Sequence, residues 1–313
     1  MRLGFSVTVV GRPGLRSHDS RRWQNRPHLS VSLAYLRDLF LYLDSQRICM
    51  YRLSSDLAPY LTHPAFPEFH RQIEECEAEL AATGDQGRRL GLRLRFHAGA
   101  HVVLNAADEL LATRARTELS GQARLLAAMG VGPEAVIVLH VGASQPNNRQ
   151  AALQAFCRGF ESLPPDVRAR LVLEHDDRLF EVDDCLWVHQ RTGVRLVFDL
   201  LHHQLYNPTG LPTAYALAAC LETWPAEQTP KIHVSTPATE LVRDRRKRPH
   251  PPRLNRHSAY LNPFPVIDFL RSLPPVRDFD VMIEARAKDL ALLQLRQHLG
   301  VYAPDLVERY GIA

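Results

Sequence analysis

The chain has 313 residues, of which 45% are hydrophobic, and it carries a formal net charge of +4. A chain of this length buries about 75% of the surface that its unfolded form exposes, so it can fold without staples. Five scattered cysteines without a CxxC pair exclude a disulfide framework and a cysteine-based zinc site. No apolar run approaches the roughly 20 residues of a membrane span, and the N-terminus lacks the pattern of a signal peptide, so we expect a cytoplasmic protein.

Eight short apolar segments follow one another along the chain, and amphipathic patterns separate them. The first two segments span residues 2–10 and 47–54, and the other six end at His97, His140, Glu174, Asp199, His233 and Glu284. Helical spacing of apolar residues occurs at 33–43, 69–80, 110–129, 151–160, 215–224, 266–273 and 290–299. Apolar strands alternating with amphipathic helices predict a parallel sheet that eight units can close into a single (β/α)8 TIM barrel. We expect residues 1–300 to form this domain and residues 301–313 to be a terminal helix or tail.

The last six predicted strands each end in His, Asp or Glu. In a parallel barrel the C-terminal strand ends meet at one face, so these side chains should become neighbours. Imidazole and carboxylate ligands without thiolates suit Mn²⁺, Fe²⁺ or Zn²⁺. Six or more ligands exceed what one tetrahedral ion takes, so we expect two or three ions, an arrangement typical of phosphoryl transfer.

Several further residues near the strand ends have chemistry of their own. His202 and His257 are the additional histidines most favoured as metal ligands. Lys231 lies two residues before His233 on the same strand and should therefore face the same side. Such a lysine could be carboxylated by CO₂, or it could form an ion pair with Glu174 or Glu284, and the sequence leaves both interpretations open.

Two clusters of basic residues follow predicted strands. One spans residues 12–26 around Trp23, and the other spans residues 243–256. Runs of charge are usually solvated surface, but on loops at the active-site face arginines can bind phosphates. Trp23, Tyr260 and His101 could stack on bases.

Eight stretches of the chain resemble one known family in the order in which that family has them. They are YRLSSDLAP (51–59), FHAGAHVVLN (96–105), VLHVGAS (138–144), LVLEHDD (171–177), VFDLLHHQLYNP (197–208), KIHVS (231–235), HSAY (257–260) and MIEARAKD (282–289). The family is that of the UV damage endonucleases, whose architecture is similar to that of endonuclease IV and the xylose isomerase-like barrels.

The resemblance implies a DNA repair endonuclease that cuts the backbone immediately 5′ to a UV photoproduct or an abasic site. It implies a monomer acting on damaged double-stranded DNA with a metal cluster, usually assigned as manganese, for which zinc and magnesium are alternatives. The implied metal ligands are His97, His140, Glu174, Asp199, His202, His233, His257 and Glu284. Glu174 and Lys231 are the expected catalytic residues, and Lys231 matches the position of the family's modified lysine, which favours carboxylation.

The chain departs from the family at the residues that probe the lesion. The family has a Gln followed by an aromatic residue where this chain has Ala100 and His101, and it has Tyr and Asn where this chain has Phe5 and Val9. We therefore expect damage recognition to involve other groups as well. The expected DNA contacts are Ala100, His101, Phe5, Tyr260, Arg245, Arg246 and Arg248.

Three alternatives accompany this prediction. A metal-dependent sugar isomerase or epimerase uses the same barrel and the same ligand types, but it has no use for arginine-rich loops at the rim. An abasic-site endonuclease without photoproduct specificity is a second alternative. A non-catalytic nucleic-acid-binding barrel would have lost ligands, and no ligand is lost in the sequence.

Overall fold

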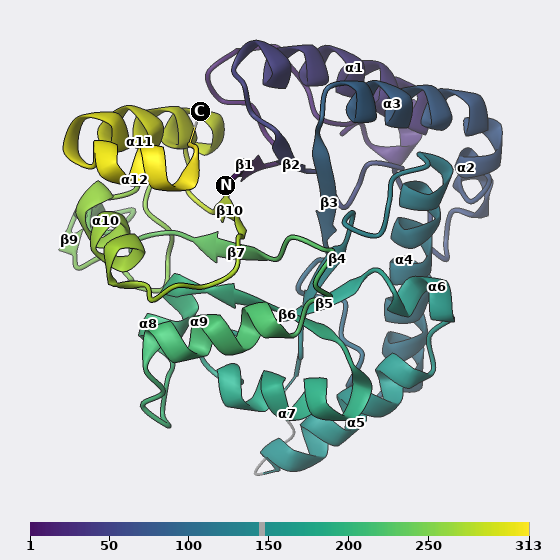
Figure 1. Ribbon diagram of the computed structural model, residues 1–313. Helices are drawn as coiled ribbons and strands as arrows, with labels where there is room; N and C mark the ends of the chain where they lie inside the picture. The colour runs from purple at the N-terminus through teal and green to yellow at the C-terminus, as the bar shows by residue number, and fades with distance from the viewer. Residues whose placement is uncertain (144–147, 313) are drawn as a thin grey trace.

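The computed structural model describes residues 1–143 and 148–312 (Figure 1). Ser144, the last residue of the VLHVGAS stretch, and Ala313, the last residue of the expected tail, lie outside them. All eight predicted apolar segments form strands of one closed parallel barrel, in the order β1-β10-β7-β6-β5-β4-β3-β2. The barrel strands are β1 (Leu3–Ser6), β2 (Met50–Arg52), β3 (Arg93–His97), β4 (Ile137–His140), β5 (Leu171–Glu174), β6 (Arg195–Asp199), β7 (Lys231–Val234) and β10 (Asp280–Ile283).

Helices surround the barrel and cover its outer side (Figure 1). All seven predicted helical patterns correspond to helices, although the second is divided into α2 and α3. Among the described residues the helices are α1 (Leu29–Ser45), α2 (Gln72–Glu75), α3 (Glu77–Arg89), α4 (Glu109–Ala128), α5 (Arg149–Glu161), α6 (Pro165–Arg168), α7 (Val182–Thr192), α8 (Leu200–Leu205), α9 (Thr213–Glu222), α10 (Pro263–Ser272), α11 (Lys288–Tyr302) and α12 (Pro304–Tyr310), with short 3-10 turns η1 (Trp23–Asn25) and η2 (Pro67–Phe69). None of these helices is long and apolar enough to cross a membrane.

The alternation of side chains along each strand separates an outer apolar layer under the helices from a barrel interior that contains both valines and polar side chains. On β5, Leu171 and Leu173 belong to the large apolar core under the helices, whereas Val172 packs with valines of β4 and β6 in a small second cluster. Glu174 follows Val172 with the same facing and is fully buried. The alternation therefore directs the strand-end ligands into the barrel mouth.

The end of the chain is integrated into the structure. Residues 304–310 form α12, which packs beside α11 and α10, and Leu306 is buried. The N-terminal amine of Met1 donates a hydrogen bond to the carbonyl of Tyr310 (2.6 Å). The residues expected as a terminal helix or tail thus contain a packed helix, and its last residue contacts the N-terminus.

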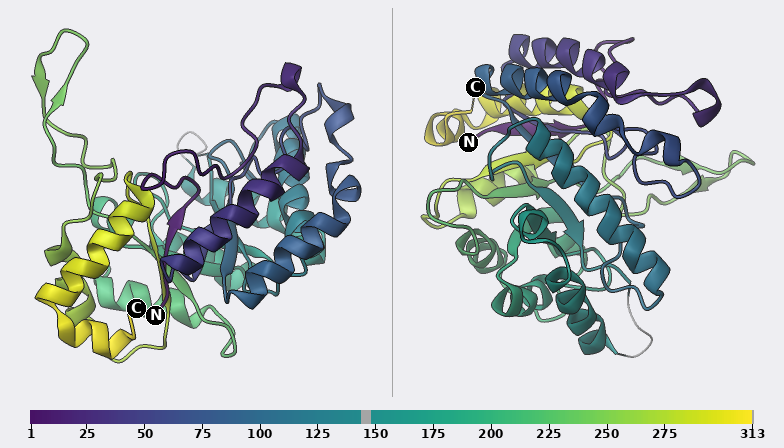
Figure 2. Two further views of the ribbon diagram at one scale, coloured as in Figure 1. Left: turned by 90° about the horizontal axis from the view of Figure 1, so that it is seen from above. Right: turned by 90° about the vertical axis from the view of Figure 1, so that its right-hand side faces the viewer.

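Two segments project beyond the C-terminal ends of the barrel strands (Figure 2). One is a hairpin formed by β8 (Val242–Arg243) and β9 (Pro249–His250), which pair antiparallel within the long loop after β7. The other is the loop that carries η1. The two projections lie on opposite sides of the barrel mouth in Figure 2, and both coincide with the basic clusters of the sequence.

Candidate metal centre

Glu174 lies at the centre of the barrel mouth with imidazoles on several sides. Its side chain is fully buried, and its carboxylate oxygens lie 2.8 Å from His233 Nδ1, 3.1 Å from His97 Nε2 and 3.4 Å from His202 Nδ1. His140 Nε2 is 3.8 Å away. One carboxylate from β5 thus faces ligands contributed by β3, β4, β7 and α8.

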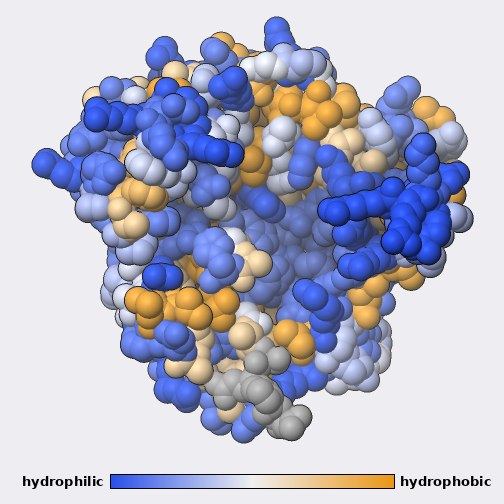
Figure 3. Space-filling model, turned by 180° about the vertical axis from the view of Figure 1, so that it is seen from behind, coloured by the Kyte–Doolittle hydropathy of each residue, from blue (hydrophilic) through white to orange (hydrophobic). Residues whose placement is uncertain are grey.

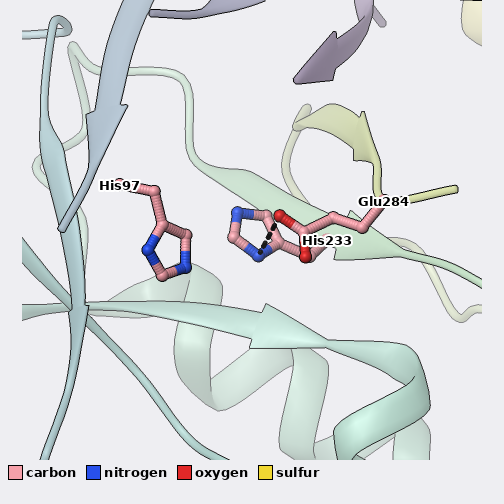
Figure 4. A group of neighbouring side chains, drawn as sticks. All are labelled: His97, His233 and Glu284. Carbon is pink, nitrogen blue, oxygen red and sulfur yellow. Dashed lines mark ion pairs between the residues drawn. The ribbon is translucent and has the colours of Figure 1, made fainter. Parts of the chain in front are cut away.

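Three groups of side chains present possible ligand atoms within 4.8 Å of one another. The first, His97, His233 and Glu284, is drawn in Figure 4, where the histidines and the carboxylate point toward a common space. The second group, His97, His140 and Glu174, shares His97 with the first, and the third, Glu174, Asp199 and His202, shares Glu174 with the second. Seven of the eight sequence-predicted ligands are therefore brought together.

The eighth predicted ligand, His257, lies beside the cluster without joining these groups. Its ring centroid is 6.4 Å from that of His202, and its Nδ1 is buried with no hydrogen-bond partner in the described chain. Asp199 Oδ2 is orphaned in the same way. Two unpartnered buried polar atoms beside clustered ligands fit a bound cation, because buried polar atoms otherwise find partners.

The hydrogen bonds of three histidines also fit metal ligation. Nδ1 of His97 donates to the carbonyl of Ala98 (2.9 Å), and Nδ1 of His140 approaches the carbonyl of Glu174 (3.2 Å). Nδ1 of His202 donates to the carbonyl of His175 (3.0 Å). Metal-bound histidines usually hold their second nitrogen in this manner, which leaves Nε2 free for the ion.

Local structure places Asp199 and His202 together. Asp199 is the last residue of β6 and the N-cap of α8, and its carboxylate accepts a hydrogen bond from the backbone N–H of His202. Residues three apart on a helix share a face, so both side chains turn toward Glu174. His175, which the sequence reasoning did not select, supports this turn: its buried Nε2 accepts from the backbone N–H of Asp199 (3.0 Å). His203 points elsewhere and packs against Phe198.

Crowding of like and unlike charges shifts the pKa values in the cluster. Burial alone would raise the pKa of Glu174, but His233, His140 and its hydrogen bonds lower it well below the ordinary value. Burial also acts on Asp199 and, with Glu174 and Glu284, raises its pKa to about 6 against the opposing effect of His202. Burial lowers the pKa of His202, but Asp199, Glu174 and Glu284 outweigh it and raise that pKa to about 9. As the pH rises, Asp199 therefore loses its proton before His202 does.

Arginines that the sequence reasoning missed support the cluster from below and from one side. Arg95 is almost fully buried on β3 and contacts His233 Nε2, and its Nη2 lies 3.8 Å from Glu284. Arg52, on β2, donates to Glu284 at 3.2 Å. Arg95 lies two residues before the end of β3, so alternation gives its side chain the same facing as that of His97. Arg52 is the last residue of β2. An arginine inside a barrel was not expected from hydrophobicity alone.

Lys231 is buried at the start of β7, deeper in the barrel than His233. Its Nζ has no hydrogen-bond partner among the described residues, and it forms no ion pair with Glu174 or Glu284 there. Burial, together with the charges of Arg95, Arg93 and Arg195, lowers its pKa well below the ordinary value. The ion-pair interpretation of Lys231 is therefore wrong for this structure, and the charges of three arginines act on the buried amine together with the opposing charge of Glu174.

Comparison with known proteins shows the family in which this arrangement occurs. A family model described as UV-endonuclease UvdE matches residues 22–308. The chain belongs to the UV-endonuclease family. It is 30% identical to a UV DNA damage endonuclease of Bacillus pumilus over 267 residues, covering 84% of this chain and 78% of that protein. It is 31% identical to the one of Halalkalibacterium halodurans over 260 residues, covering 82% and 76%.

Solved structures agree with this assignment. The crystal structure of SacUVDE superposes with a TM-score of 0.80 at 27% identity, covering 96% of this chain and 98% of that one. Endonuclease IV from Thermus thermophilus gives 0.58 at 15% identity, covering 98% and 100%, which shows the shared fold. The 3-keto-D-glucoside 4-epimerase of E. coli gives 0.57 at 13% identity, covering 96% and 99%, and likewise shows only the fold. The UV-endonuclease barrel is thus the expected TIM barrel, and the chain is a member of a nuclease family.

The expected DNA contacts of this UV-endonuclease occupy different environments. Ala100 and His101 are exposed on the loop after β3, and Tyr260 is 42% exposed. Phe5 is fully buried in the outer apolar layer, edge-on to Tyr51 at 5.5 Å. The prediction that Phe5 contacts DNA is wrong, because strand alternation turns its ring toward the helices, away from the barrel mouth.

The basic hairpin contains two kinds of arginine. Arg245 and Arg246 are exposed and have no ion pair among the described residues. The guanidinium of Arg248 is engaged by Asp244 at 2.9 and 3.0 Å. The space-filling view toward the barrel mouth shows a hydrophilic central hollow, with the most hydrophilic surface on the side of the hairpin (Figure 3).

Proposed function

We propose that this protein incises double-stranded DNA immediately 5′ to UV photoproducts, and also at abasic sites. The observation that carries the proposal is Glu174, a member of two of the three potential metal-ligand groups, in a barrel mouth flanked by two basic projections. Membership of the UV-endonuclease family supports the reaction class, and its relatives are named for action on UV-damaged DNA.

The metal centre is proposed to hold two or three divalent ions, Mn²⁺ in preference to Zn²⁺ or Mg²⁺. The three overlapping ligand groups support this number, and the mixture of imidazoles and carboxylates favours Mn²⁺ over purely oxygen-bound Mg²⁺. Divalent ions bound there would activate water at neutral pH and stabilise charge on the leaving oxygen of the phosphodiester. His257, with its orphaned Nδ1, is proposed as the ligand that completes the set.

The scissile phosphate is proposed to enter a hollow of about 450 Å³ beside Glu284. This hollow is lined by Arg52, Arg256 and Lys288, and Lys288 donates to Ser6 Oγ (2.9 Å). Three cations next to the ligand cluster would bind and orient a phosphodiester anion, because positively charged groups in a cleft concentrate anionic substrate. Arg245 and Arg246, free of ion pairs within the described chain, are proposed to bind backbone phosphates farther along the duplex.

Lys231 is proposed to be carboxylated. Carboxylation forms on a neutral amine, and burial among Arg93, Arg95 and Arg195 favours the neutral amine. The carbamate would be an anion, so it would pair with the arginines that the ammonium repels. Electron density at Nζ in crystals grown at or above neutral pH tests this proposal, and an unmodified amine there would contradict it.

One assay tests the activity as a whole. Purified protein with Mn²⁺ is incubated with end-labelled duplexes that carry a photoproduct, an abasic site or no lesion, and the cut position is mapped. Incision 5′ to the photoproduct is expected, and cutting confined to abasic sites would favour the narrower abasic-site endonuclease. We further propose that the protein is a monomer, since one chain supplies every proposed ligand of the centre. We also propose that it is located in the cytoplasm with the DNA.

A further inference from the structure

A buried carboxylate outside the metal centre holds the start of one of the two basic projections. Asp289, in the first turn of α11, is fully buried. It accepts hydrogen bonds from the backbone N–H groups of Val10 (2.7 Å) and Gly11 (3.0 Å) and from the hydroxyl of Tyr42 on α1 (2.7 Å). Val10 and Gly11 directly precede the basic cluster of residues 12–26, which we call the basic loop. One side chain therefore connects α11, α1 and the start of the basic loop.

The hydrogen bonds of Asp289 come from outside its own helix. An aspartate at a helix start usually accepts from the N–H groups of that helix, as Asp199 does for α8. Asp289 instead accepts from the segment after β1 and from α1. Burying a carboxylate is costly unless such hydrogen bonds replace its hydration. The buried position of Asp289 is therefore stable only while Val10, Gly11 and Tyr42 stay in place, and it fixes them in turn.

The residue before Asp289 has a strained backbone. Lys288 has a φ of +54°, in the left-handed region that residues other than glycine seldom adopt. The N–H of Ala287 donates to the carbonyl of Ala259 (2.9 Å) on one side of this turn, and Asp289 is bound to the segment after β1 on the other. Strained residues persist where the surrounding structure over-determines the backbone, and they cluster at functional sites.

The side chain of Lys288 lies in the hollow beside Glu284. Its Nζ donates to Oγ of Ser6 (2.9 Å), the last residue of β1, and both residues line the hollow. Val7, the next residue, has a φ of +59°, which is rare for a β-branched side chain. Its carbonyl accepts a hydrogen bond from the hydroxyl of Tyr51. The backbone is therefore strained at or next to both partners of the Lys288–Ser6 hydrogen bond.

We propose that Asp289 is a positioning residue that fixes the basic loop and the amine of Lys288 in one arrangement for the DNA backbone. The proposal rests on the proposed function, because it presupposes that the hollow receives the scissile phosphate. Asp289 acts through Val10 and Gly11 on the loop and through the strained turn on Lys288. Loss of its hydrogen bonds would free the start of the loop and let Lys288 relax to an ordinary backbone conformation, which would withdraw Nζ from the hollow.

The first measurement requires neither metal nor DNA. Asp289→Asn keeps the size of the side chain but replaces one acceptor oxygen by a donor, so it cannot accept all three hydrogen bonds. Trypsin cleaves after arginines that proline does not follow, which in the basic loop are Arg16, Arg21 and Arg22. Brief digestion of the full chain in EDTA should cut this loop about fivefold faster in Asp289→Asn than in the parent, because cleavage follows the population of locally opened chain. Mass spectrometry of the fragments identifies the cut positions.

Asp280→Asn is the matched control for the loss of a buried carboxylate. Asp280 is 3% exposed at the start of β10, and it accepts hydrogen bonds from the backbone N–H of Arg2 (2.8 Å) and from the guanidinium of Arg93 (2.7 Å). Its substitution should lower the Tm at least as much as Asp289→Asn does. At a temperature where both variants are folded, however, cleavage within the basic loop of Asp280→Asn should keep the parental rate.

The second measurement asks whether Asp289 acts through Lys288. Single-turnover incision at saturating protein is compared in the parent, Asp289→Asn, Lys288→Met and the double variant. Asp289→Asn should slow incision about tenfold in the parent but less than about twofold in the Lys288→Met background, because residues that act together have non-additive effects. A merely structural role of Asp289 would give the same loss in both backgrounds.

The outcomes distinguish the positioning role from the activity. Parental loop cleavage in Asp289→Asn, or equal losses in the two backgrounds, overturns the proposal. If Asp289→Asn does not fold, Tyr42→Phe removes one of the three hydrogen bonds and should change both measurements in the same direction. If the parent does not incise in Mn²⁺, the proposed function fails, while faster loop cleavage still supports the hold of Asp289 on the loop. If the parent incises and the loop cleavage is unchanged, only the positioning role fails.

Discussion

The carboxylate of Asp199 accepts a hydrogen bond from the backbone N–H of His202 at 2.8 Å, so one carboxyl group both begins α8 and faces the metal centre. One side chain can act as helix cap and as metal ligand because Oδ1 accepts the hydrogen bond from the helix, while Oδ2 has no hydrogen-bond partner within the described residues. The position of His202 is therefore fixed by Asp199 before any cation is bound.

Two substitutions at Asp199 separate these roles. Asp199→Asn keeps an acceptor for the cap and should preserve the fold while weakening metal binding and incision more than tenfold. Asp199→Ala also removes the cap, which should cost about 0.5–2 kcal/mol of unfolding free energy in addition. Urea denaturation and metal titration of both variants check this, and equal stability of the two variants would contradict the capping role.

Glu174→Gln should abolish incision and leave the fold intact. A neutral amide cannot replace a carboxylate that faces four histidines, so the loss should exceed the roughly 10–100-fold expected for a residue that only supports a ligand. Circular dichroism, metal content and single-turnover incision are the measurements. His175→Gln is the comparison, since it changes a supporting residue, and near-normal turnover of Glu174→Gln with full metal content would remove Glu174 from the site.

Metal affinity should rise with pH up to about 9. The folded-state pKa of His202, about 9, exceeds the ordinary value of 6.5, so protonated His202 stabilises the folded protein fully below about pH 6.5. That stability is lost as pH rises through about 9. A metal ion binds only the neutral imidazole, so its binding must release the proton of His202. Calorimetric titrations of Mn²⁺ in two buffers of different ionisation heat at pH 7.5 should show proton release, reduced in His202→Asn.

Neutralising Arg245 and Arg246 should weaken binding to damaged and undamaged duplexes alike. The slope of log K against log[salt] should flatten by about 0.9 for each DNA phosphate that an arginine no longer neutralises. Arg248→Ala should act differently, because its guanidinium holds Asp244 in the hairpin turn, and it should change the order of the hairpin more than the slope. An unchanged slope in the Arg245/Arg246 double variant would identify the hairpin as solvated surface.

Ala100→Gln with His101→Tyr should improve binding to photoproducts that distort the duplex only mildly. His101 is paired with Glu118 and offers a small stacking surface, so the parent should favour strongly distorting lesions and abasic sites. Competition binding with a series of lesions measures this preference. If the double variant gains nothing and His101→Ala loses nothing, the probing group lies elsewhere.

The barrel and most of its ligands were predictable because strand alternation and strand-end convergence are periodic properties of the sequence. Glu174 and His233 could be placed in one site from their positions at the ends of apolar runs alone. The outward orientation of Phe5 also follows from alternation, which outweighs the family resemblance that suggested a DNA contact at that residue. The helix Val182–Thr192 was missed since its apolar stripe is short, although Glu181 and Asp184 form a capping box and Gly193 ends it in a left-handed conformation.

Other features depend on contacts between segments distant in sequence, which no local pattern contains. The hydrogen bonds that Asp289 accepts are recognisable only when α11 is placed against the segment after β1. Close approach there is permitted by Gly11, where a Cβ would meet the carboxylate of Asp289 at 2.8 Å. The arginine environment of Lys231 likewise arises from two other strands, β3 and β6, so its sequence position could not decide between carboxylation and an ion pair.

The ligand groups are drawn from β3, β4, β5, β6, β7, α8 and β10, so five of the eight pairs of neighbouring strands in the barrel carry ligands on both strands. Any cation bound there ties segments from His97 to Glu284, and an unfolded chain has no such preformed site. The free energy of metal binding then adds to the free energy of unfolding of the barrel, and this contribution grows with the logarithm of the free metal concentration. The melting temperature of this protein should consequently report metal availability, and a chelator should loosen the whole barrel as well as its mouth.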